Sequence, residues 1–554
     1  MEKLRYRHSK HFIRHEERFP LTFADPFPLL HRPIDESVIN ESQKHSSVHL
    51  LIPVSESNPE FCKTILSAFV IGYPAPTLIN WGKHSEEGAI FKEATSHTAK
   101  IKGVYNYLND RAKIKDNDLV MIVDGYDVWF QLPMQVIIER YRELIEEMNQ
   151  RLKDIYGMIS KDENGDNVAE RVPKYTQSVI FSADKICWPN PKVDPACVAV
   201  PYSTLPEDVY GPDTDRDPKA FHNRPRYLNS GNVIGPVKNV RDVYEAALTK
   251  VEKGEGDLGD QFVFAEVFGE QEFQRETLRQ EAQTTGESWL EWISDKLYPS
   301  ESPLSANITI KNLTAVPGQR YEFGIGLDYE SRLFQTMTHS AADIEFIYYN
   351  SSSSSELLSA NHQHSSLPLF LPKDLQSANA PLSYASPGNR TGESDPGRKT
   401  FLLPYSANLD NLPDQEVGGF EPSWRSMPLA TNTYAATIPG LLHINGDKSL
   451  LESWWPKMWY HPYARALLRR FIRSTQTLEA AEAAATGGKH WWDLRGGRGG
   501  VWTDQATWMS WQEVCKGVDD EVFGDGKGVF GEEEGKQRLV NAFGMALIGE
   551  KDNT

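Results

Sequence analysis

Short apolar runs and longer amphipathic segments follow one another along residues 48–152 of the chain. The short runs end at small or polar residues, as buried strands do. The longer segments place apolar side chains at helical spacing. The pattern therefore predicts strand, helix, strand, helix, strand, helix. The predicted strands are residues 48–55, 76–80 and 118–123, and the predicted helices are residues 59–73, 97–111 and 134–152.

This alternation predicts an α/β fold with a parallel sheet that helices cover on both faces. Ligands of such folds bind beyond the carboxyl ends of the strands, which is where Ser55 and Asp124 fall. The same criteria predict further strands at residues 176–183, 226–235, 321–328, 343–349 and 440–446.

Four segments depart from this pattern. Residues 1–45 are interpreted as an irregular, partly basic arm, and residues 270–318 as an insertion with a charged helix and a polar linker. Residues 350–430 are rich in Ser, Pro, Asn and Gly, which cannot build a core, so we interpret them as a second insertion that is largely disordered. Residues 462–554 indicate a helical, Gly- and Trp-rich extension with an acidic tail from about residue 515.

The charge of the chain narrows the choice of partners. With 77 acidic and 58 basic residues, the net charge is −19, and such a surface repels nucleic acid and anionic lipid. No apolar run is long enough to span a bilayer, and the first twenty residues lack the apolar stretch of a signal peptide. We expect either a cytosolic protein or one whose targeting segment is missing from this chain.

Cysteines and sequons bear on the compartment. Cys187 and Cys197 bracket a Pro-rich loop that a disulfide could close, whereas Cys62 and Cys515 lie far apart in the sequence. Sequons for N-glycosylation favour secretion, although chance produces a few in a chain of this length. They lie at Asn40, Asn307, Asn312, Asn350 and Asn389.

The stretch "DLVMIVDGYDVWF" places two carboxylates, Asp124 and Asp127, at the end of an apolar strand. Two acids at this spacing can point to one spot and hold Mg²⁺ or Mn²⁺, leaving coordination positions open for phosphate oxygens. The alternative is a structural turn in which Asp124 caps the next segment. A phosphatase of the haloacid type is disfavoured because Tyr126 stands where that class needs its second acid.

Three other stretches carry candidate chemistry. In "YLNSGNVIG", small residues let the backbone approach a ligand, although an ordinary bulge would look the same. In "GDLGDQFVF", Asp260 either faces a ligand or caps a helix. In "LLHINGDK", His443 could complete a metal site, and the Gly446 turn with Lys448 could hold a diphosphate, although a histidine at a strand end is more often structural.

The order of these stretches resembles the glycosyltransferase domain of procollagen lysyl hydroxylases and, more distantly, the collagen galactosyltransferases. The resemblance covers roughly residues 48–460, which we take as one domain at 46–461. It is carried by "HLLIPVSES", "KIKGVYNYL", "LVMIVDGYDVWF", "VIFSADKICWP", "RYLNSGNVIG", "GDQFVFAEVF", "IGLDYESRLFQTM" and "LLHINGDK". It implies a GT-A type, Rossmann-like mixed sheet, Mn²⁺ or Mg²⁺, and a UDP-sugar donor.

The resemblance also implies roles for matching residues. Asp124, Asp127 and His443 would be the metal ligands. Asp260 would lie beside the transferred sugar, and Asn229 would frame the sugar pocket as the second catalytic candidate. The remaining donor-binding positions would be Val54, Ser55, Lys100, Tyr126, Ser230, Gly231, Gly446 and Lys448, with Tyr126 stacked on uracil.

Two positions depart from the family pattern. Gly259 replaces the first of two acids that precede the Gln, and Lys448 sits one residue closer to the His-x-x-Gly turn than expected. The leading hypothesis is a transferase that moves a hexose, glucose or galactose, from UDP to an acceptor hydroxyl on a protein, glycan or lipid-linked molecule. The alternative is a non-catalytic UDP-sugar or glycan-binding protein on the same scaffold. The family also implies the lumen of the endoplasmic reticulum or Golgi.

Overall fold

The computed structural model describes most of the predicted domain and part of the C-terminal region. The chain divides by its backbone contacts at residues 44 and 45, and all described residues belong to the second unit. The predicted arm at 1–45 and most of the insertion at 350–430 lie outside the described residues. The structure describes residues 47–83, 92–161, 170–255, 258–285, 302–304, 318–350, 369–379, 381, 423–465, 467–468, 499–524, 538–540 and 546–548.

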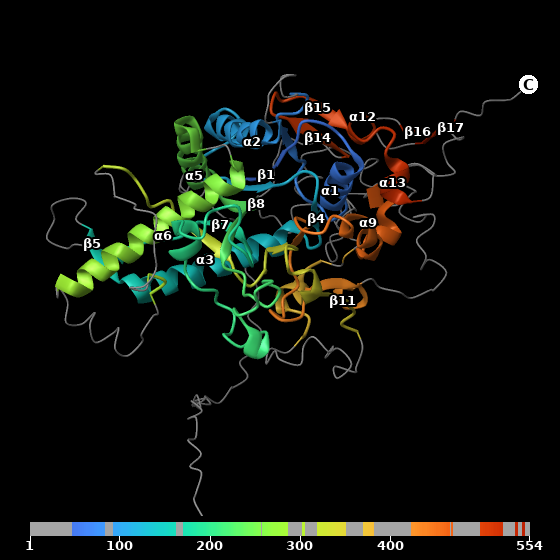
Figure 1. Ribbon diagram of the computed structural model, residues 1–554. Coiled ribbons are helices and arrows are strands. Elements are labelled where there is room, and N and C mark those ends of the chain that lie inside the picture. Colours follow the sequence, from blue (N-terminus) through green and yellow to red (C-terminus); the bar gives the residue numbers. More distant parts are fainter. Residues whose placement is uncertain are drawn as a thin grey trace, which may run out of the picture. The chain divides into compact units, whose positions relative to one another are not determined.

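The described unit is built on a mixed eight-stranded sheet of order β15-β14-β2-β1-β3-β8-β7-β9 (Figure 1). All neighbouring strands pair in parallel except β8, which is antiparallel to β3 and β7, and β15 at the edge. The bounds are β1 (Val48–Pro53), β2 (Thr77–Ile79), β3 (Leu119–Val123), β7 (Val179–Asp184), β8 (Tyr227–Pro236), β9 (Ile325–Asp328), β14 (Gly500–Thr503) and β15 (Trp508–Ser510).

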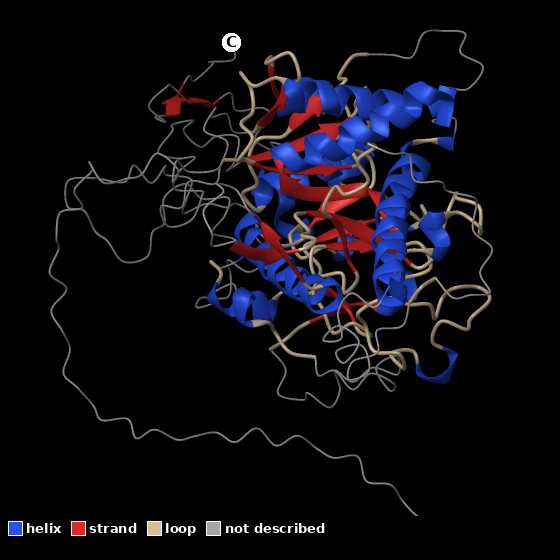
Figure 2. Cartoon of the chain, turned by 90° about the vertical axis from the view of Figure 1, so that its left-hand side faces the viewer, coloured by secondary structure: helices blue, strands red, loops and turns tan. Residues whose placement is uncertain are grey.

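Helices cover both faces of this sheet, as predicted (Figure 2). Along β3, Met121 and Val123 pack into one apolar cluster and Val120 and Ile122 into the other, because successive side chains of a strand point to opposite faces. The first cluster includes α1 (Pro59–Val70) and α3 (Met134–Tyr156). The second includes α2 (Lys92–Asn109), α5 (Val237–Lys250) and α6 (Asp260–Thr285).

A smaller sheet of order β10-β13-β4 brings together three distant parts of the sequence. Its strands are β10 (Phe334–Thr336), β13 (Leu441–His443) and β4 (Val128–Phe130). β13 lies parallel to β10 and antiparallel to β4. The sequence pattern does not predict β4 as a separate strand, because only three apolar residues, Val128, Trp129 and Phe130, follow Asp127 before Gln131.

Shorter elements complete the described residues. Three two-stranded ribbons pair β5 (Met158–Lys161) with β6 (Glu170–Pro173), β11 (Ile344–Ile347) with β12 (Leu429–Asn432), and β16 (Arg538–Val540) with β17 (Ala546–Ile548). The short α-helices are α4 (Pro195–Val198), α8 (Lys373–Ser377), α9 (Leu450–Ser453), α12 (Trp511–Val514) and α13 (Asp519–Phe523). Among the described helices, none is both long and apolar enough to cross a membrane.

The structure corrects the start of the first insertion. Residues 270–285 do not leave the domain, because they continue α6. Arg275 is buried there and pairs with Glu272 at 2.7 Å and with Glu322 at 2.6 Å. The charged composition of this segment misled the sequence interpretation, since its charges are satisfied inside the fold. The rest of the insertion lies mostly outside the described residues.

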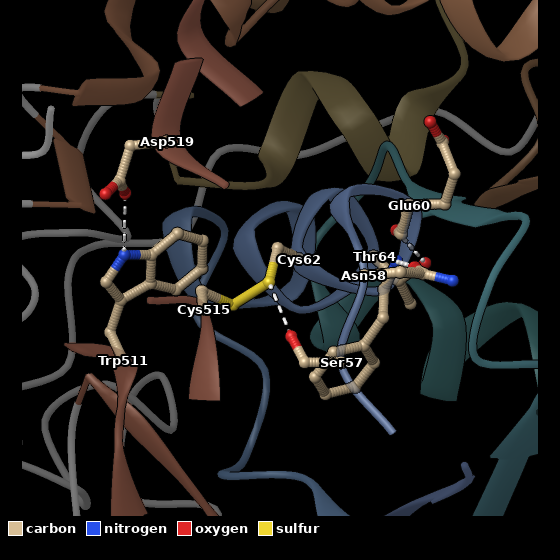
Figure 3. Close-up of a disulfide and its surroundings, with 9 residues drawn as sticks. Ser57, Asn58, Glu60, Cys62, Thr64, Trp511, Cys515 and Asp519 are labelled. Carbon is tan, nitrogen blue, oxygen red and sulfur yellow. Dashed lines mark hydrogen bonds between the residues drawn. A yellow bond between two sulfur atoms is a disulfide. The ribbon is translucent and has the colours of Figure 1, made fainter. Parts of the chain in front are cut away.

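The interpretation of an acidic tail is wrong for residues 515–524. Cys515 is fully buried and forms a disulfide with Cys62 of α1 (Figure 3). Val522 is buried as well, and its carbonyl accepts a 2.8 Å hydrogen bond from the Trp455 indole. Because β14 also joins the main sheet beside β2, residues 499–524 of the predicted extension are integrated in the sheet domain. A second disulfide, Cys187–Cys197, closes the Pro-rich loop.

Candidate functional site

Asp124, Asp127 and His443 meet at the junction of the two sheets. Asp124 directly follows β3, Asp127 directly precedes β4, and His443 ends β13, where it pairs with Val128. His443 Nε2 lies 3.6 Å from Asp124 Oδ2 and 3.4 Å from Asp127 Oδ1. One ligand atom from each residue fits within a 4.8 Å group. Two carboxylates and an imidazole at these distances could hold a divalent metal ion.

Backbone hydrogen bonds fix the three ligands. The Asp124 amide donates to the Gly231 carbonyl at 2.8 Å, and the Ile444 amide donates to the Asp127 carbonyl at 2.7 Å. Gly231 leaves room for the histidine, because a Cβ at this position would overlap the His443 ring and lie 2.7 Å from Asp124 Oδ2. Close packing against His443 and Asp124 therefore requires a residue without a Cβ at position 231, and the sequence alone does not show which side chains pack there.

The charges of the trio are balanced against one another. Burial lowers the pKa of His443, but the carboxylates of Asp127 and Asp124 outweigh burial and raise it. Burial raises the pKa of Asp127, but His443 and Lys448 together bring it well below its usual range. Desolvation dominates at Asp124 and raises its pKa despite the neighbouring Lys100. The three groups thus form one electrostatic unit.

Two lysines flank the trio. Lys448 Nζ lies 2.6 Å from Asp127 Oδ2 and donates to the Ile444 carbonyl at 2.7 Å. On the other side, Lys100 Nζ lies 2.5 Å from Asp124 Oδ1 and 2.7 Å from Asp260 Oδ2. Burial opposes the charge on Lys100, but the two carboxylates raise its pKa above the ordinary value. Lys100 therefore links the candidate metal ligands to Asp260, the first residue of α6.

Asn229 and Ser230 frame this region from β8. The Ser230 hydroxyl donates to Asp260 Oδ2 at 3.2 Å, and its amide donates to Gln261 Oε1 at 2.8 Å. The Asn229 side chain is buried and donates to Asp184 Oδ2 at 2.9 Å, while its Oδ1 accepts from the Gly231 amide at 3.0 Å. Asn229 therefore holds the backbone of the site in place.

Asp184 is a site residue that the sequence analysis missed. It ends β7, is buried, and accepts hydrogen bonds from Asn229 and, at 3.3 Å, from the Asn445 amide. Burial raises the pKa of Asp184, while hydrogen bonds and His443 oppose that rise. The signal was present in "VIFSAD", an apolar strand that ends in an acid as "LVMIVD" does.

The other predicted positions lie around the same strand ends. The Ser55 carbonyl accepts a 2.8 Å hydrogen bond from Gly82, and the Tyr126 hydroxyl donates to the Glu56 carbonyl at 3.1 Å. Val54 is buried, and a Cβ at residue 125 would lie 3.2 Å from the Cβ of Val54, so the turn between the two acids packs on the end of β1.

Two glycines shape the site further. A Cβ at Gly446 would lie 3.2 Å from the Met337 carbonyl and from the backbone of Thr338. Gly259 has a φ of 90°, a conformation that side chains with a Cβ rarely adopt. A glycine at position 259 therefore suits the backbone turn that leads into α6.

No family model matches the chain, and no curated protein matches it.

Proposed function

We propose that the protein is a metal-dependent glycosyltransferase of the GT-A type, which moves a hexose from a UDP-sugar to an acceptor hydroxyl. The observation that carries the proposal is the convergence of Asp124, Asp127 and His443, with a lysine on each side. A group of two acids and a histidine between two ammonium groups suits a divalent cation and a diphosphate. The alternative of a structural turn does not require His443 or either lysine.

Separate residues would bind the metal, the diphosphate and the nucleoside of the donor. Asp124, Asp127 and His443 would hold Mn²⁺, which when bound supplies positive charge for the departing diphosphate. Lys448 would bind the same diphosphate from the other side, because its ammonium group is half exposed and can turn from Asp127 to phosphate. Tyr126, Val54 and Ser55 would bind the nucleoside at the end of β1.

The sugar of the donor would bind on the Lys100 side of the site, away from Lys448. Asp260 is held by Lys100 and Ser230, so its carboxylate would orient the hydroxyl groups of the transferred hexose. Asp260 in turn stabilises the charged form of Lys100 by their ion pair, which raises the pKa of Lys100. The acceptor oxygen would form the new bond to the anomeric carbon and release its proton to water, while the bond to UDP breaks and UDP leaves with the electron pair.

Calorimetric titration of UDP in Mn²⁺ tests the binding site. Asp127→Ala removes a ligand that also orients Lys448, so we expect it to abolish UDP binding. Lys219→Ala, a change on an exposed loop residue, serves as the control. Unchanged UDP affinity in Asp127→Ala would show that the metal assignment is wrong.

A non-catalytic UDP-sugar or glycan-binding protein on the same scaffold is the second candidate, and Gly259 is the residue that favours it. Incubation with UDP-glucose or UDP-galactose and Mn²⁺, with release of UDP as the readout, separates the two. Release favours the transferase. Intact UDP binding without release from any donor, in the presence of protein, glycan and lipid-linked acceptors, favours the binding protein.

For the compartment, we propose the lumen of the secretory pathway. Its support is the pair of disulfides, which persist in oxidising compartments and are rare in the cytosol. The sequon at Asn350 lies on an exposed residue that a glycan could reach. Detection of N-glycans on the protein from its native host would support this proposal, and fully reduced cysteines in that protein would contradict it.

A further inference from the structure

A pocket of about 330 Å³ lies apart from the residues assigned to the donor. It is bounded by the turn after β2, by one face of α2, and by the turn between β14 and β15. Its volume falls in the range of small-molecule sites. The residues that line it are Asn80, Lys83, Ala99, Lys102, Gly103, Asn106, Tyr107, Lys113 and Asp504.

The lining of this pocket is basic, although the chain as a whole carries a net charge of −19. Three of its lining residues are lysines, and Asp504 is its acid. Lys83 Nζ lies 2.9 Å from Asp504 Oδ2. Lys113 Nζ donates to the Asp504 carbonyl at 3.0 Å and lies 3.1 Å from Asp110 Oδ2, which is outside the lining. Lys102 is exposed and forms no ion pair with another described residue. The lining therefore carries a surplus of positive charge.

The walls of the pocket are held together by specific contacts. Asn80 adopts a φ of 68°, its amide donates to Asp504 Oδ2 at 3.2 Å, and its side chain donates to the Ala99 carbonyl at 2.9 Å. Gly103 permits this approach, because a Cβ there would lie 2.5 Å from the Asn80 amide group. Three segments distant in sequence thus meet in one fixed arrangement, so the pocket exists before a ligand arrives.

We propose that this pocket is a second ligand site, which binds a small phosphate-bearing molecule. A phosphate monoester carries nearly two negative charges, so it is attracted by three ammonium groups of which two are paired with carboxylates among the described residues. Lysines act as mobile point charges, whereas the planar fork of arginine recognises carboxylates by paired hydrogen bonds. The lining contains no arginine. The Asn106 amide and the three ammonium groups supply hydrogen bonds to phosphate oxygens.

The pocket is connected to the candidate donor site through two shared segments. Lys102 lies on α2 two positions after Lys100, which contacts Asp124 and Asp260. The turn that carries Asn80 and Lys83 also donates the Gly82 amide to the Ser55 carbonyl. An occupant would therefore stiffen segments that border the donor, but the site itself does not depend on transferase activity.

Calorimetric titration of the full chain with inorganic phosphate, at low ionic strength and with EDTA, tests the proposal. We expect Lys102→Gln/Lys113→Gln to weaken phosphate binding at least tenfold. The control Lys219→Gln/Lys253→Gln removes two exposed lysines outside the pocket and should keep the affinity of the wild type. Equal weakening in both double variants, or none in the pocket variant, would overturn the proposal.

Two further titrations show which site binds the phosphate and whether the site prefers phosphate to a carboxylate. Lys448→Ala should bind phosphate as the wild type does, and loss in that variant would place the phosphate in the donor site instead. Acetate should bind at least tenfold more weakly than phosphate, and equal affinity would refute phosphate selectivity. Titration of Lys102→Gln/Lys113→Gln with UDP and Mn²⁺ should show wild-type affinity, which separates this proposal from the proposed function.

Discussion

Replacing Gly231 with alanine tests the candidate metal site at its most crowded point. The added methyl group would overlap the ring of His443, lie 2.8 Å from its Nδ1 and lie 2.7 Å from Asp124 Oδ2. Contacts this short require the neighbours to move, and the His443 ring is buried against β8. We therefore expect the imidazole to turn away from the two carboxylates while the fold is retained.

Gly231→Ala is expected to lower both the stability of the fold and the affinity for the metal. Overpacking of a core by one methyl group costs about 1–3 kcal/mol of stability. Displacement of a metal ligand by a change in its surroundings lowers metal affinity by about 10–100-fold. We expect Gly231→Ala to show both effects when thermal unfolding and Mn²⁺ titration are measured on the same sample.

Gly235→Ala on the same strand provides the matched control. A Cβ at Gly235 would lie 2.9 Å from the Ser178 carbonyl and 3.1 Å from a methyl group of Val240, away from the metal ligands. It should lower stability as Gly231→Ala does but keep the Mn²⁺ affinity of the wild type. If Gly231→Ala bound Mn²⁺ as tightly as Gly235→Ala, the assignment of His443 to the metal would be refuted.

Three other changes probe the donor site and the fold. Lys448→Ala should lower UDP affinity in Mn²⁺ about tenfold by calorimetry, since one diphosphate contact is lost. The variant should bind Mn²⁺ alone as tightly as the wild type does. Unchanged UDP affinity would contradict the proposed role of Lys448. Asp118→Asn should cost roughly 1–3 kcal/mol at pH 7, because the buried carboxylate accepts from His49 at 3.0 Å and from two backbone amides. Burial raises the pKa of Asp118, but these hydrogen bonds lower it below 3.8, so the stabilisation is present above about pH 4 and is lost as the pH falls further. Urea unfolding at several pH values measures this, and a gap between wild type and variant that widens in acid counts against it. Cys62→Ala/Cys515→Ala should lower the free energy of unfolding by roughly 2–5 kcal/mol and expose residues 499–524 to proteases, and a variant as stable and resistant as the wild type would show that the disulfide is dispensable.

Much of the candidate site could be predicted from local patterns. Asp124 was recognisable because an apolar strand before an acid places that acid at the ligand-binding edge of a sheet. The proximity of His443 was an expectation from the family resemblance, and the structure brings its ring beside both acids. Asp184 was missed, because its partners Asn229 and Asn445 are distant in sequence and its burial is visible only in the folded chain.

Local periodicity by itself determined the alternating strands and helices of residues 48–152, because 2-residue and 3.6-residue repeats are fixed by backbone geometry and need no distant partner. Local periodicity does not predict that β4 pairs with β13, that β14 joins the sheet beside β2, or that Cys62 forms a disulfide with Cys515. Those pairings depend on which distant surfaces bury one another, and the same local pattern is compatible with many such arrangements. Only the tertiary structure decided them, and with them which side chains share the candidate metal site.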